Sequence, residues 1–126
     1  MVSLGLVMLG GAFGAGSRHL VNVGMLRAFG PGFPMGTLTV NVLGGLLMGF
    51  LAGWLALRSE AGGQGLRLFL ATGVLGGFTT FSAFSLDAVL LWQRGAAGMA
   101  LAYVLASVIL SILALAFGVS LARALT

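Results

Sequence analysis

The segment Gly76-Gly77-Phe78-Thr79-Thr80-Phe81-Ser82 lies midway through an apolar stretch, residues 66–92. Two adjacent glycines followed by two β-branched threonines are poor helix formers. An unbroken helix over this stretch would also be about 40 Å long, more than the roughly 30 Å of a hydrocarbon core. Irregular backbone at membrane depth is tolerated only where it is buried or lines a cavity. We therefore predict a membrane helix broken near its middle, with a kink that only aids packing as the alternative.

Three further apolar stretches flank this one, and each is long enough to cross a bilayer: residues 2–26, 36–57 and 96–122. Apolar residues make up 60% of the 126 residues and charged residues only 6%, whereas a soluble domain carries roughly 25% charged residues. We predict an all-α membrane protein with four transmembrane helices in one domain, residues 1–126. Four passes through the lipid bilayer put both termini on the same side.

Few residues of this sequence can carry out acid–base or metal chemistry. The chain has no Cys, one His and two acidic residues, Glu60 and Asp87. Disulfides and thiolate metal sites are therefore excluded, and no nucleophile–base pair can be assembled, so we expect no enzymatic activity. The six basic residues are scattered arginines without a basic run, so we expect no nucleic-acid partner.

The arginines divide almost evenly between the two sides of the predicted membrane domain. Arg58, Arg67, Arg123 and Glu60 fall on the side of the termini, Arg27 and Arg94 on the opposite side, and Arg18 is assigned to neither. Orientation follows an excess of basic residues in cytoplasmic loops, so a chain without an excess can insert both ways. Two copies can then pair about a two-fold axis in the membrane plane; an accidental balance is the alternative.

Glycine is abundant, at 22 of 126 residues, and much of it recurs at spacings of four. Gly10 and Gly14 share a face of the first span, and Gly45, Gly49 and Gly53 share a face of the second. Small residues let membrane helices approach closely, because lipid supplies no hydrophobic drive for their association. We predict tight helix packing along both faces.

Uncharged polar side chains follow faces of three spans. They are Thr37 and Asn41 on the second span, Thr79, Thr80, Ser82 and Ser85 on the third, and Tyr103, Ser107 and Ser111 on the fourth. Hydroxyls and amides donate hydrogen bonds without titrating near pH 7. Such donors suit a small anion that must lose water as it passes, although each residue alone can equally hold two helices together.

Asp87 and two phenylalanines complete the candidate residues of the third span. Asp87 lies toward the end of the span, and we interpret it as a partner for a nearby arginine or as a helix-end charge. Phe81 and Phe84 are three residues apart and share a face. A core aromatic pair is one interpretation; the other is that their positive ring edges steady a dehydrated anion without binding it tightly.

These motifs together resemble the Fluc (CrcB-type) fluoride ion channel family over all four spans. The resemblance rests on Gly36-Thr37-Leu38-Thr39-Val40-Asn41 with Gly44-Gly45, on Gly73 to Gly77 leading into Phe78-Thr79-Thr80-Phe81-Ser82-Ala83-Phe84, and on Gly10, Gly14 and Arg18. It implies an antiparallel, dual-topology homodimer with two narrow pores in the inner membrane of a prokaryote. It also implies passive fluoride export that relieves toxicity and discriminates against chloride.

The resemblance assigns roles to individual residues of this chain. It implies a structural Na⁺ held by the backbone carbonyls of Gly76 and Thr79, and a vestibule at Arg18. The implied pore residues are Asn41, Phe81, Phe84, Thr37, Ser82, Tyr103, Ser107 and Ser111. Ala83 stands where the family motif has a Thr, which weakens any role for a hydroxyl at that position.

Two other function classes fit a small four-span protein. A dual-topology exporter of cationic drugs would carry a Glu within the first span, and this span has no carboxylate. A structural membrane subunit would need neither the polar rows nor the Gly-Gly-Phe-Thr-Thr segment. The sequence therefore favours the channel over both.

Overall fold

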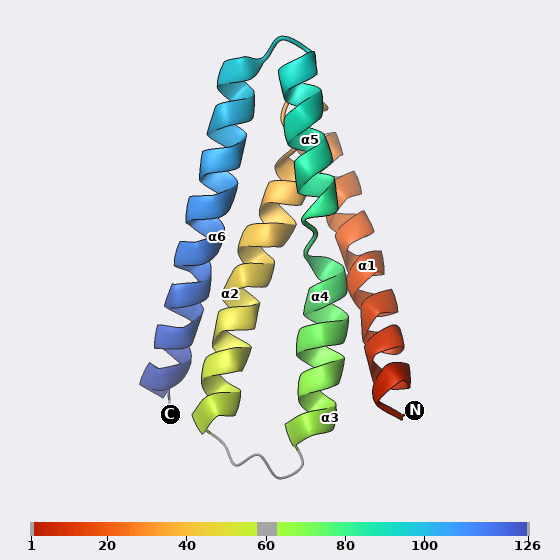
Figure 1. Ribbon diagram of the computed structural model, residues 1–126, viewed down its shortest axis with the longest axis vertical. Coiled ribbons are helices and arrows are strands. Elements are labelled where there is room, and N and C mark those ends of the chain that lie inside the picture. The colour runs from red at the N-terminus through yellow and green to blue at the C-terminus, as the bar shows by residue number, and fades with distance from the viewer. Residues whose placement is uncertain (1, 58–62, 126) are drawn as a thin grey trace.

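The computed structural model describes residues 2–57 and 63–125, and the elements of these residues are helices (Figure 1). They are α1 (Val2–Phe29), α2 (Met35–Leu57), α3 (Gly63–Arg67), the π-helical segment η1 (Leu68–Leu75), α4 (Gly76–Phe78), α5 (Ser82–Gln93) and α6 (Ala97–Leu125). The start of α1 and the end of α6 lie at the same end of the molecule (Figure 1).

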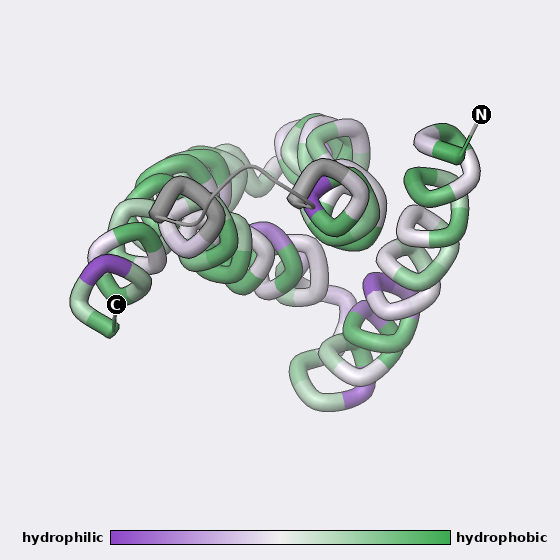
Figure 2. The backbone as a smooth tube through the Cα atoms, turned by 90° about the horizontal axis from the view of Figure 1, so that it is seen from below, coloured by the Kyte–Doolittle hydropathy of each residue, from purple (hydrophilic) through white to green (hydrophobic). Residues whose placement is uncertain are grey.

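Long apolar helices make up almost all of this structure. In the described part of the chain, three segments are long and apolar enough to cross a membrane: Met35–Trp54, Gly65–Gln93 and Ala97–Leu125. Helix α1 has 28 residues, but Arg18 and His19 interrupt its apolar sequence, and its passage through the membrane remains a prediction. Apolar residues cover most of the tube in Figure 2. The protein is thus an all-helical, multi-pass membrane protein.

The ends of α1 and α6 differ from the predicted spans. Helix α1 continues to Phe29, so Arg27 lies in its last turn and not in the following loop. It ends where Gly30 adopts a φ of 76° and donates its N–H to Leu26 O at 2.8 Å, a common glycine cap that is followed here by a proline. Arg123 likewise lies in the last turn of α6. Arg58 and Glu60 lie outside the described residues.

The backbone leaves the α-helical conformation between α4 and α5. Residues 79–81, which we call the junction, separate the two helices, and Thr79 is extended with φ −83° and ψ 159°. Gly76 and Gly77 are helical, contrary to their predicted place in irregular backbone. Close packing explains Gly77, since a Cβ there would meet Gly11 O at 2.7 Å. The interruption therefore falls on the threonines.

Two glycine contacts hold the helices together and confirm the predicted tight packing. Helix α2 packs most extensively on α6, where a Cβ on Gly49 would overlap the Leu115 carbonyl and a Cβ on Gly45 would lie 2.8 Å from Ser111 O. Helix α1 packs on η1, where Gly10 and Gly73 meet backbone to backbone. These two contacts form a frame on either side of the junction.

Candidate functional site

Asn41 of α2 fixes the junction by pairing with both backbone polar groups of Thr80. Its Nδ2 donates to Thr80 O at 3.0 Å, and its Oδ1 accepts the Thr80 N–H at 2.8 Å. The two residues are 39 positions apart in the chain. A single side chain thus satisfies both the donor and the acceptor of a residue that lies outside the helices.

Side-chain acceptors at the junction take the helical donors of two backbone carbonyls. In a continuous α-helix the Thr80 N–H would donate to Gly76 O, and the Ala83 N–H would donate to Thr79 O. The first N–H instead donates to Asn41, and the second donates to Thr80 Oγ1 at 3.2 Å. The carbonyl oxygens of Gly76 and Thr79 therefore do not accept the N–H groups of the residues four positions later, which they would accept in a continuous α-helix. These are the two carbonyls that the sequence resemblance assigned to Na⁺.

A cavity of about 400 Å³ lies beside the junction. The described residues that line it are uncharged: Asn41, Gly44, Gly45, Met48, Thr79, Thr80, Phe81, Phe84, Ser107, Val108, Ser111, Ile112 and Leu115. The hydroxyl oxygens of Ser107 and Ser111 are buried and have no hydrogen-bond partner within the described part of the chain. A buried unsatisfied hydroxyl costs about 1–3 kcal/mol, so both hydroxyls could gain a hydrogen bond that the described residues do not supply.

The two phenylalanines at the junction have different surroundings. Phe84 is buried, with its ring centroid 5.2 Å from that of Tyr103. Phe81 contacts Phe84 at 5.5 Å with an interplanar angle of 48°, but 78% of its surface is exposed. Both rings line the cavity. Phe84 packs as a core residue, whereas Phe81 projects from the surface of the single chain.

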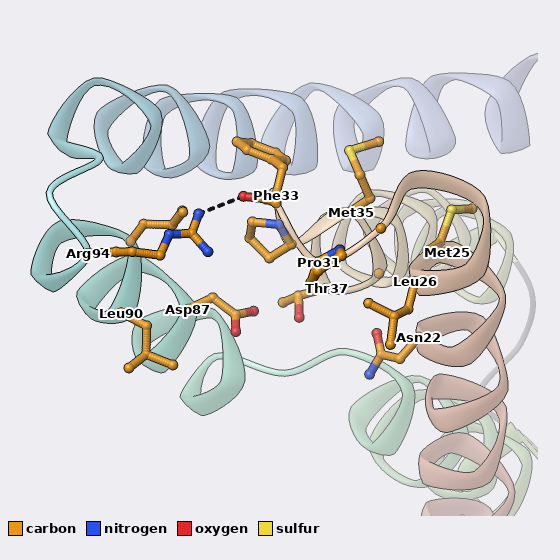
Figure 3. A pocket seen from close by; sticks show the side chains of 15 residues that line it. Asn22, Met25, Leu26, Pro31, Phe33, Met35, Thr37, Asp87, Leu90 and Arg94 are labelled. Carbon is orange, nitrogen blue, oxygen red and sulfur yellow. Dashed lines mark hydrogen bonds between the residues drawn. The ribbon is translucent and has the colours of Figure 1, made fainter.

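A second cavity, of about 340 Å³, lies between the α1–α2 loop and α5 (Figure 3). Thr37 and Asp87 line it and point toward one another. The fully buried Tyr103 donates its hydroxyl to Asp87 Oδ2 at 3.2 Å. The described partner of Asp87 is therefore a tyrosine, where the sequence suggested an arginine or a helix end.

The structure divides the predicted site residues among several places. Asn41, Thr79, Phe81, Phe84, Ser107 and Ser111 line the first cavity, and Thr37 lines the second with Tyr103 close by. Ser82 is exposed, with its hydroxyl 3.4 Å from Thr80 Oγ1. Gly76 and Arg18 belong to neither set of lining residues.

Sequence reasoning missed the backbone role of Thr80 and the pairing of Asp87 with Tyr103. No local signal identifies either, because each depends on how one segment packs against another: the junction against α2, and α5 against α6. Thr80 was noted only as one hydroxyl in a polar row, whereas its amide and carbonyl both bind Asn41.

The chain matches a known family over nearly its whole length. The family model described as "CrcB-like protein, Camphor Resistance (CrcB)" matches residues 5–119. A protein of Chelativorans sp. is 58% identical over 125 residues, and one of Mesorhizobium japonicum is 54% identical over 125 residues; both alignments cover 99% of each chain. A Caulobacter vibrioides protein is 54% identical over 98% of this chain and 97% of its own. Each relative is named "Fluoride-specific ion channel FluC". These matches cover nearly the whole chain, and they show that the chain belongs to the CrcB family.

Proposed function

We propose that this protein is a channel that lets fluoride cross the membrane passively, and that it thereby relieves fluoride toxicity without catalysing a reaction. The names of its relatives support this substrate. The observation that carries the proposal is the pair of buried, unpartnered hydroxyls of Ser107 and Ser111 in an uncharged cavity beside Phe84.

Neutral donors suit a small anion for a physical reason. Fluoride must exchange its water for hydrogen bonds from the protein, and a carboxylate in the same cavity would repel it. Asn41 adds a donor, because only one of its two Nδ2 hydrogens is used by Thr80. Ser107, Ser111 and Asn41 then offer hydrogen bonds without a full positive charge that would trap the ion.

Aromatic edges would extend this weak contact. The edge of a phenyl ring carries partial positive charge, and conduction needs several weak sites in place of one tight site. Phe81 and Phe84 border the cavity with the serine hydroxyls. In this proposal the hydroxyls of Thr37 and Ser82 supply further donors along the path, the ring of Tyr103 lines it while its hydroxyl stays bonded to Asp87, and Arg18 attracts anions at a vestibule.

The donor set of the junction fits a resident sodium ion. Na⁺ is a hard cation that prefers oxygen ligands, and the carbonyls of Gly76 and Thr79 have both lost their helical donors to side chains. Gly76 and Thr79 would hold the ion. The ion would supply a fixed positive charge at the helix interruption, and we propose that this interruption lies in the middle of the membrane. Replacing Na⁺ by K⁺ should lower the melting temperature of the protein in detergent; equal melting temperatures in both salts would contradict a structural Na⁺.

An antiparallel homodimer in the inner membrane of a prokaryote completes the proposal. Among the described arginines, Arg27 and Arg94 end helices at one end of the molecule, while Arg67 and Arg123 lie near the other. This balance supports insertion in both orientations. A second copy would also cover Phe81, which is 78% exposed, and the cavity with its unpartnered serines.

Flux from liposomes tests the channel directly. The purified protein is reconstituted in vesicles loaded with fluoride or chloride, and efflux is followed with ion-selective electrodes after a K⁺ ionophore is added. We expect fast fluoride efflux and little chloride efflux. Equal flux of both ions would remove the selectivity. No flux of either ion from folded protein would contradict the channel and favour the cation exporter or the structural subunit.

A further inference from the structure

Four aromatic rings form a continuous row from the α1–α2 loop to the junction. The Phe33 ring meets Tyr103 edge-on, with centroids 5.5 Å apart and an interplanar angle of 88°. Tyr103 contacts Phe84 at 5.2 Å, and Phe84 contacts Phe81 at 5.5 Å. We call these residues the aromatic row. Tyr103, Phe84 and Phe81 are proposed pore residues. Phe33 lies far from them in sequence and is not one of the proposed pore residues.

The loop that carries Phe33 is held in place on both sides. Arg94, just beyond α5, donates from Nη2 to Gly32 O at 2.7 Å (Figure 3). On the other side the Met35 N–H donates to Phe33 O at 2.8 Å. Pro31 and Pro34 flank Phe33 and restrict the backbone of the loop further. The ring of Phe33 therefore projects from a rigid support.

Tyr103 can pass a displacement from Phe33 to Phe84 because it has no free space around it. Its exposed fraction is 0%, and its hydroxyl is bonded to Asp87. Phe33, Phe84 and Tyr103 belong to one packed cluster. When the Phe33 ring is removed, Tyr103 gains room to tilt, and Phe84 loses the surface that holds it at the cavity.

We infer that Phe33 is a positioning residue for ion conduction: from the loop between α1 and α2 it holds Tyr103, and through Tyr103 it sets the position of Phe84. Arg94 holds the loop that carries Phe33. The inference rests on the proposed conduction path. It predicts that a residue outside the membrane-spanning helices controls flux without touching the ion.

The chain offers a specific probe, because Tyr103 is its only tyrosine. Biosynthetic labelling with 3-fluorotyrosine gives a single ¹⁹F resonance, recorded in fluoride-free buffer, that senses the rings around Tyr103. Phe33→Leu is compared with Phe33→Trp, which restores an aromatic ring. Phe29→Leu is the matched control, since Phe29 ends α1 close to the loop but is 60% exposed.

We expect Phe33→Leu to shift the resonance and to slow fluoride efflux about three- to ten-fold, the range that an edge-to-face aromatic contact supports. Phe33→Trp should recover at least half of the flux, and Phe29→Leu should change neither readout. Arg94→Gln, which removes the bond to Gly32, should shift the resonance and slow efflux in the same direction by a smaller factor.

Three results would overturn the inference: wild-type flux in Phe33→Leu, slow flux without a shifted resonance, or Phe33→Trp as slow as Phe33→Leu. If Phe33→Leu does not fold, unchanged flux and an unchanged resonance in Arg94→Gln overturn it instead. The wild-type flux separates this test from that of the channel itself. A wild-type protein that conducts no fluoride contradicts the proposed function, whereas the resonance still reports whether Phe33 positions Tyr103.

Discussion

The contact between α2 and α6 and the junction between α4 and α5 are held together by opposite kinds of interaction. Between α2 and α6, glycines bring backbone against backbone, and Gly49 has no room for a Cβ beside Leu115. At the junction, polar side chains replace helical hydrogen bonds, and Asn41 binds both polar groups of the Thr80 backbone. The first region excludes side chains, and the second depends on them.

This difference separates stability from function. A backbone contact cannot adjust by a change of rotamer, so the α2–α6 contact is a rigid part of the frame. The junction frees carbonyls and sets Phe81 and Phe84 beside a cavity of uncharged donors. Substitutions in the frame should therefore change the free energy of unfolding most, and substitutions at the junction should change ion flux most.

The largest expected effect is that of Gly49→Ala in the frame. A Cβ at this position would overlap the Leu115 carbonyl and lie 2.9 Å from Leu115 Cα, so α2 and α6 must move apart. We expect the free energy of unfolding to fall by about 3 kcal/mol, measured by denaturation in detergent. Gly24→Ala is the control, because a Cβ there meets nothing within 4 Å. Equal stability of the two variants would contradict the rigid frame.

Asn41→Asp should produce the largest loss of flux at the junction. The carboxylate keeps an acceptor for the Thr80 N–H but loses the donor to Thr80 O and adds negative charge beside the cavity. Fluoride efflux should fall about 10- to 100-fold, since a lost bond and an uncompensated charge cost about 1–3 kcal/mol. Gln93→Glu makes the same chemical change at an exposed helix end and should conduct normally. If Asn41→Asp conducts as well as Gln93→Glu, Asn41 does not border the path.

The frame could be predicted from sequence because its signal is local. Gly45 and Gly49 recur every four residues, and this spacing alone places them on one face of an apolar helix. Helix ends were less predictable: Arg27 looked like the start of a loop, yet the positive φ of Gly30 sets the end of α1. The π-helical turns of η1 had no signal in the sequence.

The candidate site was predictable in its chemistry but not in its pairing. Ser107, Ser111 and Asn41 were predicted as neutral donors, and the structure brings them to one cavity. Thr37 belonged to the same predicted row as Asn41, yet it lines the second cavity with Asp87. Which donor lies in which cavity depends on the register between α2, α5 and α6, and the spacing along one helix carries no information about that register.

Phe81→Ile tests whether the exposed ring of the junction acts on the ion. The change removes the ring quadrupole, and since 78% of this side chain is exposed in the single chain, the packing within that chain stays nearly the same. Fluoride efflux should fall about three- to ten-fold, with the oligomer unchanged in size-exclusion chromatography. Phe117→Ile, at a 61% exposed position of α6, is the matched control. Unchanged flux in Phe81→Ile would leave only a packing role for this ring.

The smallest expected effect is that of Thr80→Val, which keeps the shape of the side chain and removes its hydroxyl. Thr80 Oγ1 accepts the Ala83 N–H at 3.2 Å, so the first turn of α5 loses one hydrogen bond. The free energy of unfolding should fall by about 1 kcal/mol, measured by thermal denaturation in detergent, while Thr80→Ser should retain wild-type stability. The backbone bonds from Thr80 to Asn41 are untouched by either change. Flux should therefore decrease far less than in Asn41→Asp, and an equal loss of flux would show that the threonine hydroxyl, and not the asparagine amide, organises the junction.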